Sequence, residues 1–87
     1  IAPEGVEVLG AKIQGGVAYA DFSGKIMYPG FGSEGELAMV SAIVDTLCEL
    51  PGVEKVQILV EGEVVESLGG HVLVDSPLGR MEELVRR

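Results

Sequence analysis

The sequence predicts a small α+β domain in which a mostly antiparallel sheet packs against one long helix, in the order β-β-α-β-β. Three observations predict this class. Two stretches of alternating apolar residues meet at Gly15-Gly16, an apolar stripe at helical spacing occupies residues 33–50, and a third apolar stretch follows Pro51-Gly52. A chain of 87 residues is long enough for one modest core, so we expect a single domain over residues 1–87.

Residues 6–14 and 17–23 are predicted to form a hairpin. The glycines between them adopt positive φ readily, as a two-residue hairpin turn requires. Val6 and Val8 have the opposite parity to Leu9, so either a bulge occurs near Gly10 or the first half of the strand is buried on the other face. The side chains predicted to face inward are Leu9, Ala11, Ile13, Ala18, Ala20 and Phe22.

A long helix is predicted from Ser33 to about Leu50. Ser33 and Glu36 have the spacing of a capping box, in which each side chain accepts a hydrogen bond from a backbone N–H of the first turn. Pro51-Gly52 ends the helix. The predicted buried stripe consists of Leu37, Val40, Ile43, Val44, Leu47 and Leu50.

Residues 53–60 are predicted to form a third strand, and a short fourth strand is expected near residues 63–68. We expect the strand order 2-1-3 with the fourth strand beside the third, so that every neighbouring pair is antiparallel. Gly69-Gly70 interrupts the extended pattern, and His71 is predicted to fix this turn through a hydrogen bond. The third strand is expected to point Val56, Ile58 and Val60 inward.

The loop of residues 24–33 is rich in Gly and Pro but carries four large apolar side chains, including Ile26. One interpretation is a lid folded over the edge of the core. The other is a protein contact surface formed by Met27, Tyr28 and Phe31, because exposed apolar loops often mark interactions.

Composition excludes several classes of function. The formal net charge of −8 repels phosphate backbones and anionic membrane surfaces, so a nucleic-acid partner is not expected. The sequence has no run of 18 apolar residues, so direct membrane insertion by this domain is not expected either. The single cysteine, Cys48, excludes a disulfide within the domain. The chain begins IAPEG, without a signal peptide, so we expect a piece of a longer protein whose anchor or export signal lies outside this sequence.

No residue pattern predicts catalysis. His71, Asp75 and Ser76 contain the letters of a catalytic triad but lie too close in sequence to converge from separate elements. Cys48 is flanked by Glu49, whereas a reactive thiol needs a positive neighbour. Metal-ligand spacings and phosphate-binding loops are also absent from the sequence. We therefore expect no enzyme activity, cofactor or metal.

Several motifs in order resemble the GerMN domain family of sporulation and spore germination proteins. They are AYADFS at 18–23, GSEGE at 32–36, IVDTLCELPGVEKVQILVEG at 43–62 and GGHVLVDSP at 69–77. The resemblance covers roughly residues 5–78, and its long central block is the most specific part. Cys48 falls where a small polar residue is more usual in the family.

The resemblance implies an extracytoplasmic domain, tethered as a lipoprotein or by a single-pass anchor and similar in fold to the ring-building motifs of secretion systems. No catalytic residue is attached to the family. The sequence holds one copy of the domain, so a ring-building role is not carried over to it. The expected partner is a protein of the envelope or a second copy of the chain.

Two functions are compatible with these observations. The first is a non-catalytic interaction or assembly domain of the bacterial cell envelope, which an exposed apolar patch or sheet edge would favour. The alternative is a ligand-binding module for a cell-wall glycan or peptide, which a pocket with convergent polar groups would favour.

Overall fold

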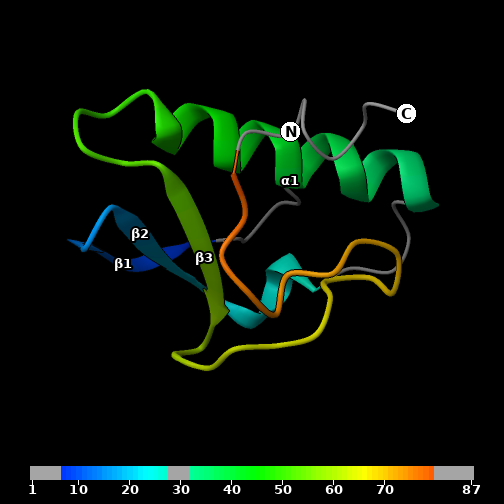
Figure 1. Ribbon diagram of the computed structural model, residues 1–87. Coiled ribbons are helices and arrows are strands. Elements are labelled where there is room, and N and C mark those ends of the chain that lie inside the picture. The colour runs from blue at the N-terminus through cyan, green and yellow to red at the C-terminus, as the bar shows by residue number, and fades with distance from the viewer. Residues whose placement is uncertain (1–6, 28–31, 80–87) are drawn as a thin grey trace.

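The computed structural model describes residues 7–27 and 32–79, and it confirms the predicted class of a small sheet against one long helix. Figure 1 shows helix α1 lying along one face of the sheet. The elements are β1 (Val8–Gln14), β2 (Val17–Phe22), the 3-10 turn η1 (Gly24–Ile26), α1 (Gly32–Cys48) and β3 (Lys55–Val60).

The predicted hairpin is confirmed. β1 and β2 pair antiparallel, with Gln14 opposite Val17 across the turn. Gly15 and Gly16 have φ values of +60° and +83°, which a side chain would disfavour. The register shifts between Val8 and Gly10, so the bulge is the correct one of the two alternatives. The predicted inward side chains of β2 (Ala18, Ala20 and Phe22) are buried.

The predicted strand order 2-1-3 is wrong. The order is β1-β2-β3, and β3 pairs parallel to β2 rather than antiparallel to β1. Backbone hydrogen bonds tie β3 to the hairpin at both ends, since the N–H groups of Glu54 and Lys55 donate to the Gly16 carbonyl and that of Glu61 donates to the Phe22 carbonyl. β2 and β3, which are joined by α1, therefore lie side by side, as consecutive strands usually do. β1 is consequently an edge strand of the three-stranded sheet.

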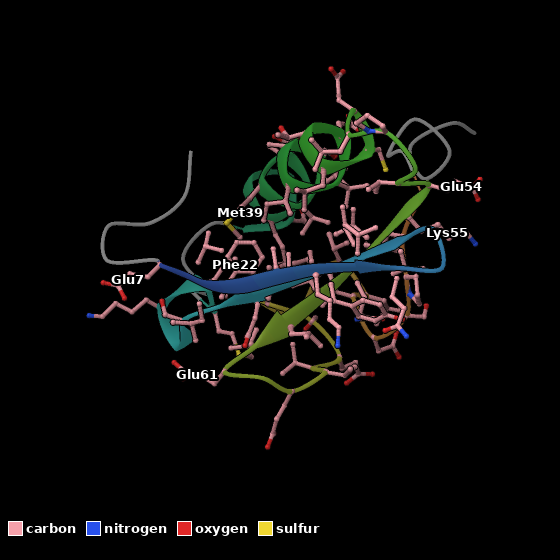
Figure 2. All side chains as sticks on the ribbon, turned by 90° about the vertical axis from the view of Figure 1, so that its left-hand side faces the viewer. Glu7, Phe22, Met39, Glu54, Lys55 and Glu61 are labelled. Carbon is pink, nitrogen blue, oxygen red and sulfur yellow. The ribbon has the colours of Figure 1, made fainter. Side chains whose placement is uncertain are left out.

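The core lies between α1 and the inner faces of β2 and β3. Figure 2 shows Met39 of the helix and Phe22 of the sheet pointing into this space. The helix ends at Cys48, so Leu50, predicted as the last residue of the stripe, is instead exposed. The side chains that α1 and β3 bury include Met39, Val40, Val44, Cys48, Val56, Ile58 and Val60.

The chain after β3 does not form the predicted fourth strand at 63–68. Isolated β-bridges join Val60 to Glu63 and Ser67 to Leu73 instead. The chain then returns beside β3, where Leu78 and Val56 exchange two backbone hydrogen bonds of 2.8 Å (Figure 1). This returning segment therefore covers the β3 edge of the sheet.

Candidate functional site

The apolar loop, which was predicted to be either a lid or a contact surface, contains one buried and one exposed large apolar side chain among its described residues. Ile26 ends η1 and is fully buried, as a lid requires. Met27, the next residue, is exposed. Tyr28 and Phe31 lie outside the described residues, so the contact surface of Met27, Tyr28 and Phe31 stays a prediction.

Glu36 joins the helix to the distant GGH turn. Its carboxylate accepts hydrogen bonds from the backbone N–H groups of His71, at 3.3 Å, and Val72, at 2.9 Å. The side chain is 1% exposed. Glu36 therefore makes a long-range contact that the capping-box prediction did not include, and Ser33 lies exposed in the first turn of α1.

Gly70 and His71 shape this turn through their backbones. Gly70 has a φ of +95°, which turns the chain so that the next two N–H groups face one carboxylate. Its own N–H donates to Ser67 Oγ at 2.9 Å. His71 contributes to this turn through its backbone N–H, while the residue as a whole is exposed.

Every residue of β1 is exposed, so the face of this strand that was predicted to point inward is not buried. Ala11 lies opposite Ala20, and Ile13 lies opposite Ala18, so both side chains do point to the helix side of the sheet. However, the helix does not cover them, and Ile13 is 52% exposed. No segment within residues 7–27 and 32–79 pairs with the outer edge of β1.

An apolar groove of about 320 Å³ runs between β1 and the C-terminal half of α1. Thr46 supplies the only polar side chain among its lining residues. The sequence signal that could have found this groove is the pair of small residues, Ala42 and Thr46, one turn apart beside the buried stripe. The groove is lined by Val8, Ala11, Ala20, Phe22, Ala42, Ile43, Thr46 and Leu47.

A second hollow, a cleft of about 550 Å³, lies at the other end of the helix. The first turns of α1 form one wall, and the segment 71–78 forms the other. His71, Asp75 and Ser76 all line it, so the fold brings together three polar residues that sequence reasoning dismissed as a triad. This grouping supplies polar groups for binding a ligand.

Metal-ligand groups and long apolar helices are absent from the part of the chain that the structure describes. No group of three potential metal ligands occurs there, and no helix there has the length and hydropathy needed to cross a membrane. Cys48 is buried, and its Sγ lies 3.6 Å from the Glu54 carbonyl oxygen. The cysteine thus packs in the core, as its helical position predicted.

Comparison with known proteins agrees with the resemblance seen in the sequence. The family model Germane, of sporulation and spore germination, matches residues 1–66. No curated protein matches the chain.

Three solved structures share the fold over more than nine tenths of this chain. A "putative lipoprotein" from Clostridium perfringens is 26% identical, with a TM-score of 0.86, and the match covers 93% of this chain and 54% of that one. The tandem GerMN domains of the sporulation protein GerM from Bacillus subtilis are 22% identical, with a TM-score of 0.76, over 94% and 28% of the two chains. The first GerMN domain alone is 25% identical, with a TM-score of 0.74, over 91% and 59%. The chain therefore spans about half the length of the first of these proteins.

Proposed function

We propose, on the premise that this chain belongs to the Germane family of sporulation and spore germination, that it is a non-catalytic interaction domain of the cell envelope. The domain works outside the cytoplasm and is held at a membrane by a segment outside this sequence. The lipoprotein name of the Clostridium perfringens protein supports this location.

The observation that carries the proposal is the β1 edge beside the apolar groove, with which none of the described segments pairs. A strand at the edge of a sheet presents unpaired backbone N–H and C=O groups that can pair with another strand. The groove lies on the helix side of this strand, where alternate side chains of an added strand would point. The occupant is therefore an extended segment of a partner protein that adds to the sheet along β1.

The charges around β1 define the chemistry of this segment. Lys12 is the only charged residue of β1 and lies opposite Tyr19, on the sheet face away from the helix. None of the described residues that line the groove carries a charge. The partner segment is thus uncharged and apolar at every second position on its groove side, and the acidic domain favours a neutral or basic flank.

Site-specific photo-crosslinking in cells tests the proposal. A photoreactive amino acid replaces Ile13, an exposed residue of β1 on the same side of the strand as the groove residue Ala11, in the full-length protein. Val64 is the matched control position, because it is also an exposed apolar residue but lies outside β1 and the groove. We expect an adduct with one partner protein from position 13 and none from position 64.

A charge in the groove should remove the same contact. Val8→Glu, Ala11→Glu and Val64→Glu all place an acid on an exposed residue. The first two should abolish the adduct from position 13, and the third should leave it. Equal adducts from positions 13 and 64 would contradict the proposal, whereas an adduct between two copies of this chain would make the second copy the occupant.

A second candidate function, binding of a cell-wall glycan or peptide, is favoured by the cleft at the start of α1. Ligand sites are concave, partly apolar and lined by a few converging polar groups. The cleft has this composition, and its volume of about 550 Å³ suits a small ligand.

A further inference from the structure

The cleft at the start of α1 has one helical wall and one irregular wall. The helical wall consists of Ser33, Glu34 and Leu37. The irregular wall, from His71 to Leu78, follows no regular secondary structure apart from isolated bridges. A wall of this kind can form a binding site only if the rest of the fold holds it in place.

Hydrogen bonds fix the irregular wall at three points. At its start, the Glu36 carboxylate holds the N–H groups of His71 and Val72. In the middle, the Val74 carbonyl accepts from Gln57 Nε2 at 3.0 Å, and the Val74 N–H donates to the Glu66 carbonyl at 2.8 Å. At its end, Leu78 is bonded to Val56 in both directions. The cleft is therefore pre-formed, which reduces the entropy lost on binding.

The polar side chains around the cleft are not used by the fold. Within the described residues, no hydrogen bond or ion pair engages the side chains of Glu34, His71 or Asp75, although all three residues are exposed at the cleft. The bonds that fix the wall use only backbone groups and the buried side chains of Glu36 and Gln57.

The cleft combines negative charge with an apolar surface. Glu34 contributes one carboxylate from the helix and Asp75 another from the facing wall, and none of the described residues that line the cleft is a Lys or Arg. Leu37, Val72 and Leu73 supply the apolar surface between these groups. Such a lining recognises a positive charge carried at the end of an aliphatic stem.

We propose that this cleft binds a short peptide with a primary ammonium group on an aliphatic side chain. The ammonium group donates hydrogen bonds to the carboxylates of Glu34 and Asp75, and its stem packs on Leu37 and Leu73. The volume exceeds what a single amine needs, which leaves room for the flanking peptide. This inference rests on the second candidate function and is independent of strand addition at β1, which uses the other half of the helix.

Titration followed by NMR amide shifts tests the proposal on the 87-residue chain. The probe is acetyl-Ala-Lys-Ala-amide, and the matched ligand is acetyl-Ala-norleucine-Ala-amide, which keeps the stem and lacks the ammonium group. We expect saturable binding of the lysine peptide, with shifts centred on residues 33–37 and 71–78. The norleucine peptide should bind about two- to fivefold more weakly, the loss expected from an ion pair at a partly exposed site.

Variants of the protein test whether the carboxylates of Glu34 and Asp75 bind the ammonium group. The double variant Glu34→Gln, Asp75→Asn should weaken binding of the lysine peptide about two- to fivefold, whereas Glu49→Gln, which changes an exposed acid outside the cleft, should leave it unchanged. Thermal unfolding checks that each variant is folded. The proposal would be overturned if the two peptides bound with equal affinity, or if the double variant and Glu49→Gln lost the same affinity for the lysine peptide. It would also be overturned if the amide shifts lay outside the cleft. Binding of 1,5-diaminopentane as tight as that of the lysine peptide would overturn the assignment of a peptide. Strand addition at β1 would be unaffected by any of these outcomes.

Discussion

The carboxylate of Glu36 joins two segments that are 35 residues apart in the chain. It accepts hydrogen bonds from two successive N–H groups in a place where the side chain is buried from water. Removing a partner from a buried N–H leaves that group unsatisfied, which costs about 1–3 kcal/mol. This one side chain therefore holds the start of the irregular wall of the cleft against the helix.

Glu36→Gln should lower the free energy of unfolding by about 1–3 kcal/mol, because the amide offers one acceptor in place of two. Chemical denaturation measures the change. Glu63→Gln makes the same substitution at an exposed position and should stay within about 0.5 kcal/mol of the parent. Equal stability of the two variants would mean that the Glu36 carboxylate does not hold the turn.

Sequence reasoning selected Ser33, Glu36, Gly70 and His71 as structural residues. It did not reveal the contact between the Glu36 carboxylate and the turn that contains Gly70 and His71. Ser33 and Glu36 match a local pattern, and local patterns are what spacing reveals. The contact from Glu36 to the GGH turn depends on the tertiary fold, which brings the turn to the helix. The available sequence signal for this contact was the glycine before His71. Gly70 has a positive φ, and such a conformation can direct successive backbone N–H groups toward one acceptor.

Strands β1 and β3 differ in burial although both carry alternating apolar residues. β3 lies under the helix and buries Val56, Ile58 and Val60, whereas β1 lies beyond the helix and buries none of its residues. Alternation correctly predicted which side chains of β2 and β3 face the helix. It could not predict the burial of β1, because burial depends on where the helix lies across the sheet and therefore on the strand order.

The same substitution should have different effects on these two strands. Ile58→Ala should destabilise the domain by about 2–5 kcal/mol, as for other large-to-small changes in a core. Ile13→Ala should change stability by less than about 1 kcal/mol, because the side chain is already half exposed. Urea denaturation of both variants decides this, and a large loss for Ile13→Ala would show that β1 is covered in the free domain.

The hairpin turn offers a second test with an internal control. Gly15→Ala should cost about 1–2 kcal/mol, because a Cβ at positive φ meets the following carbonyl oxygen. Gly10→Ala adds the same methyl group where φ is not positive and no atom lies within 4 Å, so it should be neutral or slightly stabilising. The midpoint of thermal unfolding should therefore be lower for Gly15→Ala than for Gly10→Ala. Equal midpoints would contradict the positive φ at Gly15.

The whole molecule presents two different surfaces at the two halves of one helix. The groove beside β1 is apolar and open to an added strand, and the cleft at the start of α1 is polar and acidic. The periodicity of three segments of the sequence was enough to predict the α+β class. The strand order needed long-range information, because the parallel placement of β3 beside β2 rests on backbone bonds between the turn at Gly16 and residues 54–55.

Amide hydrogen exchange of β1 tests the interaction surface most directly. The rates of residues 8–14 are compared in the isolated domain and in the full-length protein held in its envelope, with β2 as the internal reference. Strand addition predicts that amides on the outer edge of β1 exchange at least about tenfold more slowly in the envelope, because a site occupied nine tenths of the time opens about tenfold less often. Exchange of β2, already paired on both sides, should change much less. Equal rates for β1 in the two samples would contradict the account.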